Sequence, residues 1–145
     1  MKFPFNLIST FFYLGRLPKA PGTWGSLGAL LVWILIPETL LFRCSLLVIT
    51  LIVGFIACEI TLKQNDDPDP SYIVIDEVVG LWITLLFVPK TIFLFIFGFV
   101  LFRLFDILKP SFLYSVQSLK GSFGVMLDDI LAGVLALLIL CGVMA

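Results

Sequence analysis

The chain has 145 residues, which suggests one domain covering residues 1–145. Hydrophobic residues make up 61% of it, charged residues only 13%, and the mean hydropathy is +1.17, values that exclude an ordinary soluble protein and indicate an integral membrane protein. The net charge of −1 gives no reason to expect nucleic acid as a partner, and the absence of histidine excludes Ser-His-Asp, Cys-His and phosphohistidine chemistry.

The first apolar stretch, residues 3–14, superficially resembles a signal peptide, but no A-x-A cleavage site follows it. Arg16 and Lys19 come next instead. We therefore expect a retained helix that lies in the membrane interface. Its anchors would be its aromatic side chains, Phe3, Phe5, Phe11, Phe12 and Tyr13.

Residues 15–26, GRLPKAPGTWGS, form a Gly- and Pro-rich segment before an apolar run over residues 27–36. Thr23 or Ser26 can cap the helix that this run predicts. Free amide groups at the helix start, the two hydroxyls and Lys19 would suit a phosphate. An ordinary capped loop stays an open interpretation, because the glycine spacing matches neither a Walker nor a Rossmann pattern.

A second apolar run extends from about residue 40 or 45 to residue 58, and Glu59 follows it. Residues 63–71, KQNDDPDPS, are the most hydrophilic stretch, of which Asp66 and Asp67 are expected to form a solvated turn. A third run begins at residue 72 and takes in Asp76 and Glu77. The part after Glu77, residues 78–88, is shorter than a full span of about 20 residues, so four or five spans are both compatible with the sequence.

The fourth run, residues 91–108, ends in the charged block FRLFDILKP. Arg103, Asp106 and Lys109 are three residues apart and form one stripe on a helix. An interfacial cation that reaches toward water needs no carboxylate, so the aspartate between two cations favours a functional role. After a loop over residues 110–123, a last run holds Asp128 and Asp129 near its start and ends at residue 144.

If the runs cross the membrane back and forth, every charged cluster meets at one face, which we call the near side. The cations are then unevenly divided. The near side has Lys2, Arg16, Lys19, Lys63, Arg103, Lys109 and Lys120, and the far side has Arg43 and Lys90. By the positive-inside rule the near side is cytoplasmic.

The near side also collects five carboxylates, Asp76, Glu77, Asp106, Asp128 and Asp129. Two like charges about 4 Å apart repel by about 4 kcal/mol at an effective dielectric of 20, so this cluster needs a cation or protonation. Oxygen ligands without His or Cys favour Mg²⁺ over zinc or iron. Together with the neighbouring cations, they predict a phosphoester site for a lipid head group. The helix macrodipole explains one acidic pair at a helix start, but less easily two.

Four blocks in this order, LPKAPGTWGS, DPSYIVIDEVVG, FRLFDILKP and GVMLDDILAGV, resemble the phosphatidylglycerophosphatase A family over residues 15–133. The apolar runs predict an all-α, multi-pass bundle of four to five apolar helices plus an N-terminal interfacial helix. The resemblance implies that this bundle is an enzyme of the bacterial inner membrane. It implies Mg²⁺-dependent hydrolysis of phosphatidylglycerophosphate to phosphatidylglycerol on the cytoplasmic leaflet. Two departures from the family pattern, Gly121-Ser122 and Ser111-Phe112, lie in a loop and concern substrate preference more than chemistry.

On this basis we assign the following roles as a mechanistic hypothesis. Asp76, Asp106 and Asp129 would hold the metal, with Glu77 and Asp128 as a further ligand or base. The phosphate would be bound by Lys19, Thr23, Ser26, Arg103 and Lys109, with Glu59 and Asp69 in support. Attack by water and an aspartyl-phosphate intermediate both stay open. The alternative function is a small transporter or channel subunit with an acidic cation site, although such a path needs charges spread through the membrane depth.

Overall fold

The computed structural model describes residues 2–145, with the backbone alone at residues 2 and 117. The described chain is all-helical, which confirms the expected class. Its helices are α1 (Lys2–Ser9), α2 (Pro21–Leu35), α3 (Leu40–Lys63), α4 (Ile75–Leu85), α5 (Ile92–Leu108), α6 (Ser111–Gln117) and α7 (Ser122–Met144), with a 3₁₀ turn η1 (Leu14–Arg16) after α1.

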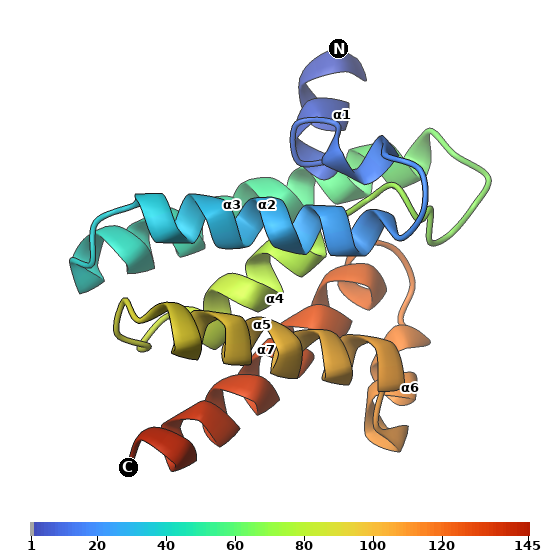
Figure 1. Cartoon of the computed structure of the whole chain (residues 1–145). Coiled ribbons are helices and arrows are strands. Elements are labelled where there is room, and N and C mark those ends of the chain that lie inside the picture. The colour runs from blue at the N-terminus through green and yellow to red at the C-terminus, as the bar shows by residue number, and fades with distance from the viewer. Residues whose placement is uncertain (1) are drawn as a thin grey trace.

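Helix α4 is the centre of the bundle, and α2, α3, α5 and α7 pack around it (Figure 1). Nine of its 11 residues are buried. At 1.5 Å per residue the helix is about 16 Å long, roughly half the thickness of a bilayer core. The third apolar run, predicted to begin at residue 72, therefore forms a short interior helix that begins three residues later, at Ile75.

Small residues let α4 and α7 approach closely. A Cβ atom on Gly133 of α7 would lie 3.0 Å from the backbone carbonyl carbon of Gly80 in α4. The Thr84 hydroxyl lies 3.0 Å from the Gly80 carbonyl oxygen and 3.2 Å from that of Gly133, so it also joins the two helices. On the other side of α4, the Trp82 indole donates to the Ala29 carbonyl of α2 at 2.9 Å.

The N-terminal helix is shorter than predicted. It ends at Ser9, and Phe11, Phe12 and Tyr13 then form a turn with positive φ angles of 45°, 57° and 65°. Phe11 is buried with its ring edge-on to Trp82 at 6.4 Å, so its assignment as a membrane anchor is wrong. The end of α1 also holds the start of α4 in place, because the Val74 amide donates to the Ser9 carbonyl at 2.9 Å.

Two further predictions of local structure are wrong. Helix α2 begins at Pro21 and not at residue 27, so Thr23 and Ser26 lie inside it and neither caps it. Proline suits the first helical position because it lacks the amide hydrogen that would go unpaired there. The expected loop over residues 110–123 contains α6.

The ends of the bundle match the predicted near and far sides. Helices α2, α4 and α7 begin at the right-hand end of Figure 1, where α3 and α5 finish. At the opposite end, Arg43 donates to the Val88 carbonyl at 3.1 Å, and the Lys90 ammonium lies 3.5 Å from the Ile36 carbonyl. The two far-side cations therefore occupy the same end.

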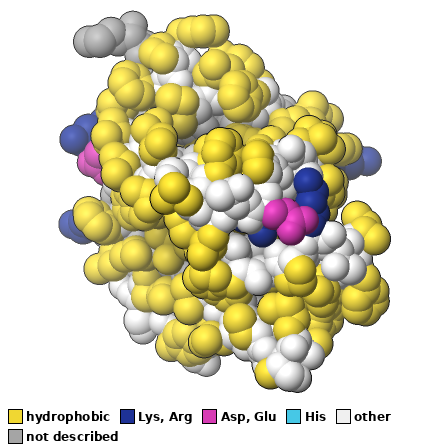
Figure 2. Space-filling model, turned by 90° about the vertical axis from the view of Figure 1, so that its left-hand side faces the viewer, with side chains coloured by type: hydrophobic (Ala, Val, Ile, Leu, Met, Phe, Trp, Pro, Cys, Tyr) yellow, Lys and Arg dark blue, Asp and Glu magenta, His cyan; other side chains and the backbone are white. Residues whose placement is uncertain are grey.

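Of the described helices, α3 and α7 are long and apolar enough to cross a bilayer. Length and composition alone carry this result, so four to five spans stay a prediction. The outer surface is rich in apolar side chains, as Figure 2 shows for the left-hand side of the bundle. Examples are Leu41, Ile49 and Leu138, which are 77%, 59% and 62% exposed.

Candidate active site

A cavity of about 830 Å³ opens at the near side, where α4 and α7 begin and α5 ends. Among the described residues, six carboxylates line it: Asp69, Asp76, Glu77, Asp106, Asp128 and Asp129. Three cations line it as well: Arg103, Lys109 and Lys120. Segments far apart in the sequence thus bring opposite charges into one cavity, with the carboxylates in excess.

Three of these carboxylates are especially close. Asp76 and Glu77 come from the first turn of α4, and Asp129 comes from α7. One oxygen from each lies within 4.8 Å of the others. Asp76 and Asp129 are buried, and the Glu77 side chain is only 14% exposed. We call these three residues the acidic triad.

The acidic triad fits a divalent cation. Two charges 4.8 Å apart repel by about 3.5 kcal/mol at an effective dielectric of 20, so three ionised carboxylates need positive charge between them. Asp76 Oδ1 and Glu77 Oε2 are buried and have no hydrogen-bond partner among the described residues. Carboxylate oxygens of this kind are the ligands that Mg²⁺ takes in proteins.

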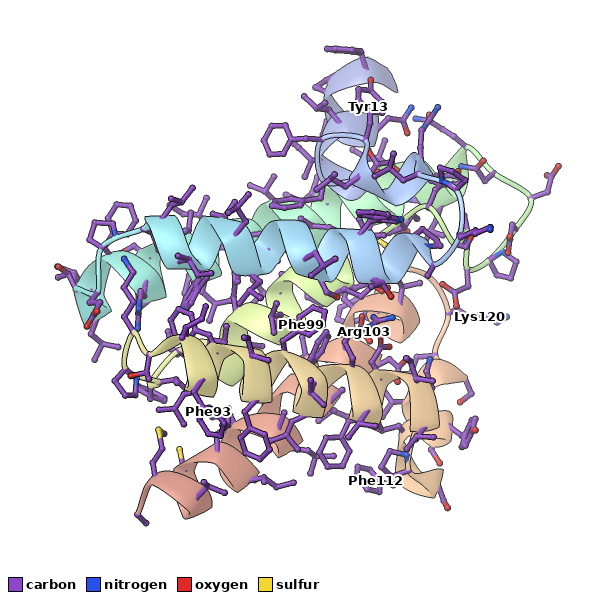
Figure 3. The ribbon with its side chains drawn as sticks, in the orientation of Figure 1. Tyr13, Phe93, Phe99, Arg103, Phe112 and Lys120 are labelled. Carbon is purple, nitrogen blue, oxygen red and sulfur yellow. The ribbon has the colours of Figure 1, made fainter. Side chains whose placement is uncertain are left out.

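Arg103 joins the acidic triad to Asp106. Its Nη1 pairs with the Asp106 carboxylate one helical turn away and lies 3.9 Å from Glu77 Oε1. Its Nη2 is 3.4 Å from the Thr23 hydroxyl of α2. Figure 3 labels Arg103 near the end of α5. Asp106 therefore lines the cavity but is engaged by a cation, which favours Glu77 over Asp106 as the third member of a metal site.

Lys109 makes the second ion pair of the cavity, with its Nζ 2.5 Å from Asp128 Oδ2. Burial opposes the charge of Lys109, but the hydrogen bond and charge of Asp128, with Asp129 and Asp106 nearby, raise its pKa above the ordinary value. Asp69 lies in the polar loop between α3 and α4 and lines the cavity, although the residue as a whole is exposed. Desolvation by the surrounding protein raises the pKa of the Asp69 carboxyl, and the charge of Lys109 opposes this shift.

Several predicted phosphate-binding side chains do not line the cavity. The buried Ser26 hydroxyl donates to the Gly22 carbonyl at 2.8 Å, and the exposed Lys19 accepts the Trp24 indole N–H at its carbonyl. Thr23 reaches the site only through Arg103. The same segment instead contributes Ala20 and the first two residues of α2, Pro21 and Gly22, to the lining.

Glu59 also has a different place from the one expected. Its Oε2 accepts the Ser122 backbone amide at 3.1 Å at the start of α7, and its Oε1 lies 3.4 Å from Lys63. It is not among the residues that line the cavity. Glu59 therefore holds the beginning of α7 and does not face the acidic triad.

Two features of the site were not evident from the sequence pattern. A Cβ atom on Gly22 would overlap Glu77 Oε1 and lie 3.2 Å from Arg103 Nη1, so any side chain at this position would displace the Glu77 carboxylate. Lys120 lines the cavity from the linker before α7. The pattern offers little signal for Lys120, because an isolated lysine before a Gly-Ser pair resembles any loop residue.

Comparison with known proteins adds independent information. The sequence model of a family described as phosphatidylglycerophosphatase A matches residues 7–144. Two proteins named phosphatidylglycerophosphatase A are similar to the chain: one from Haemophilus influenzae, 35% identical over 94% of this chain and 86% of its own, and one from Escherichia coli, 36% identical over 94% and 81%. A Bacteroides thetaiotaomicron protein with the provisional name phosphatidylinositol-3-phosphatase is 42% identical over 92% of this chain and 89% of its own. No solved structure matches the chain.

Proposed function

The chain belongs to the phosphatidylglycerophosphatase A family and is a phosphatase, and from this premise we propose that it hydrolyses phosphatidylglycerophosphate to phosphatidylglycerol and phosphate in a Mg²⁺-dependent reaction. The observation that carries this proposal is that one cavity holds the acidic triad and, beside it, two ion pairs: Arg103 with Asp106 and Lys109 with Asp128. Carboxylates that can hold Mg²⁺, with cations beside them, are the groups that hydrolysis of a phosphate ester uses.

Asp76, Glu77 and Asp129 would hold the metal. When bound there, Mg²⁺ supplies positive charge that polarises the phosphate and activates water. The unpartnered oxygens of Asp76 and Glu77 are the atoms that support this assignment. Mn²⁺, which also prefers oxygen ligands, is the natural substitute in experiments.

The remaining charged side chains have separate tasks in this mechanism. Arg103 and Lys109 would bind the phosphate oxygens, and their carboxylate partners hold them in position. Asp128 binds Lys109 through Oδ2 and leaves Oδ1 without a hydrogen-bond partner in the described chain. Asp128 is therefore the carboxylate best placed to take the proton from the attacking water.

We also propose that the protein is a multi-pass protein of the bacterial inner membrane, with the cavity facing the cytoplasm. The long apolar α3 supports this, because only 22% of its most apolar 18-residue window is buried by the rest of the chain. The concentration of lysine and arginine at the near side supports the orientation. Charges gathered at one end also fit an enzyme better than an ion path through the membrane.

The direct test is phosphate release by the purified protein from phosphatidylglycerophosphate in detergent micelles. We expect release with Mg²⁺, loss of release with EDTA, and recovery when Mg²⁺ is added back. Phosphatidylinositol 3-phosphate belongs in the same assay, because the name of the B. thetaiotaomicron relative makes it the second candidate substrate. No phosphate from either lipid, at any Mg²⁺ or Mn²⁺ concentration, would contradict the proposal.

A further inference from the structure

We infer that Lys120 binds the phosphodiester of the lipid substrate, while the acidic triad, Arg103 and Lys109 bind the phosphate monoester that is removed. This inference rests on the proposed function and names a second binding subsite in the same cavity. It makes Lys120 a specificity-determining residue that distinguishes lipids with two phosphates from lipids with one.

The pairing of the cavity cations points to Lys120. Arg103 is paired with Asp106 and lies near Glu77, and Lys109 is paired with Asp128. Lys120 has no such carboxylate partner among the ion pairs of the described residues. No carboxylate of these ion pairs balances its charge, so Lys120 can bind a second anion beside the one that Arg103 and Lys109 bind.

The backbone that carries Lys120 is fixed on both sides. Before it, the Leu119 amide donates to the Val116 carbonyl of α6 at 3.1 Å. After it, Gly121 has a φ angle of 73°, a conformation that favours glycine, and the Ser122 amide donates to Glu59. A Cβ atom on Gly121 would lie 3.0 Å from Glu59 Oε2, so the linker lies directly against α3. The lysine therefore extends from a defined point, although its side chain is exposed.

The candidate substrates carry two phosphates, so they require a further cation beside Arg103 and Lys109. Phosphatidylglycerophosphate and phosphatidylinositol 3-phosphate each carry a phosphodiester next to the diacylglycerol and a separate phosphate monoester on the head group. The cavity has more carboxylates than cations, so a second phosphate without its own cation would be repelled. Lysine, a compact charge on a flexible stem, suits a phosphodiester that needs no planar recognition.

The position of the linker agrees with the lipid end of the substrate. Leu119, next to Lys120, also lines the cavity and is 49% exposed. An apolar side chain beside a cation suits the junction between a charged head group and its diacylglycerol. Figure 3 labels Lys120 and Arg103 toward the same end of the bundle, from the α6–α7 linker and α5 respectively.

The experiment compares two lipids that differ in the phosphodiester. Full-length protein in micelles is assayed for phosphate release from phosphatidylglycerophosphate and from phosphatidic acid, which has the monoester alone. Wild type is compared with Lys120→Gln, with Lys120→Arg, which keeps the charge, and with Lys90→Gln, which removes a lysine at the far side.

In wild type, kcat/KM should favour phosphatidylglycerophosphate. In Lys120→Gln this preference should fall about tenfold, because the KM for phosphatidylglycerophosphate rises while the KM for phosphatidic acid does not, as expected for the loss of one charged contact. Lys120→Arg and Lys90→Gln should keep it. An unchanged preference in Lys120→Gln, or an equal loss with both lipids, would overturn the subsite. Phosphate release from neither lipid by wild type would overturn the proposed function and the subsite together.

Discussion

At the level of single residues, the carboxylates on the helices of the site are of two kinds: two that form an ion pair with a cation, and the three of the acidic triad. Asp106 and Asp128 each pair with a cation, whereas among the described residues the acidic triad has only the contact of Arg103 with Glu77 at 3.9 Å. Breaking a pair leaves a partly buried charge without its partner, which is costly. Removing a triad carboxylate relieves repulsion instead, so the two kinds of carboxylate should respond oppositely to mutation.

Replacing Asp129 with Asn tests this difference. Phosphate release should fall about 100-fold or more, because a metal ligand is lost. In metal-free buffer the unfolding temperature should rise, since like-charge repulsion of about 3.5 kcal/mol per pair at 4.8 Å is removed. Added Mg²⁺ should raise the unfolding temperature of wild type but not of the variant. Asp66→Asn, in the exposed loop, should change neither quantity. A variant less stable than wild type without metal would argue against three ionised carboxylates.

The pair of Lys109 with Asp128 predicts an alkaline limit to stability. In the folded chain the pKa of Lys109 is raised above its ordinary value of 10.5. The pair therefore stabilises the folded chain fully below pH 10.5, and this stabilisation is lost as the pH rises through the folded-state pKa. The unfolding temperature should therefore fall above about pH 10.5. Lys109→Arg keeps its charge at that pH and should show a smaller fall. Identical pH profiles for the two proteins would exclude Lys109 as the titrating group.

At the level of elements, the crossing of α4 and α7 determines the spacing of the acidic triad. Asp76 and Asp129 each lie one helical turn before the glycine of their own helix at the crossing, Gly80 and Gly133. Side chains four residues apart share a helix face. The distance between the two backbones at the glycines therefore sets the distance between the two carboxylates.

Replacing Gly133 with Ala should separate the helices, because its Cβ would meet the Gly80 backbone and not a movable side chain. The free energy of unfolding should fall by about 1–3 kcal/mol, and the Mg²⁺ concentration for half-maximal activity should rise. Gly142→Ala is the matched control on the same helix, where a Cβ meets nothing within 4 Å. It should stabilise the chain by about 0.5–1 kcal/mol. Equal effects of the two substitutions would mean that the crossing tolerates a methyl group.

At the level of the whole molecule, the ends of the bundle should face opposite sides of the membrane. Lys120→Cys and Lys90→Cys, each made in a chain without Cys44, Cys58 and Cys141, place a thiol at either end. A membrane-impermeant maleimide should label the Lys90→Cys variant in intact cells, and the Lys120→Cys variant only in inside-out vesicles. Labelling of both from the same side would contradict the proposed orientation.

The sequence by itself determined the helical class, the gathering of charges at one end and the family. Composition and the spacing of Arg103, Asp106 and Lys109 are local properties, and successive apolar helices that run back and forth return the chain to the same end of the bundle. Predictions from local sequence were wrong where contacts with other segments or the exact start of a helix determine a residue's environment. Phe11 is buried in the core with its ring edge-on to Trp82, and Thr23 and Ser26 lie inside a helix because Pro21 can begin one.

Only the tertiary structure decided which charges touch. Glu77 joins Asp76 and Asp129 while Asp106 pairs with Arg103, a division that depends on how closely α4 and α7 approach at their glycines. The position of Lys120 also depends on tertiary contacts. Lys120 lines the cavity two residues before Ser122, whose amide donates to Glu59 of α3 at the start of α7. Sequence spacing sets which face of a helix a side chain occupies. The distance between faces is set by packing, and electrostatic energy depends on that distance.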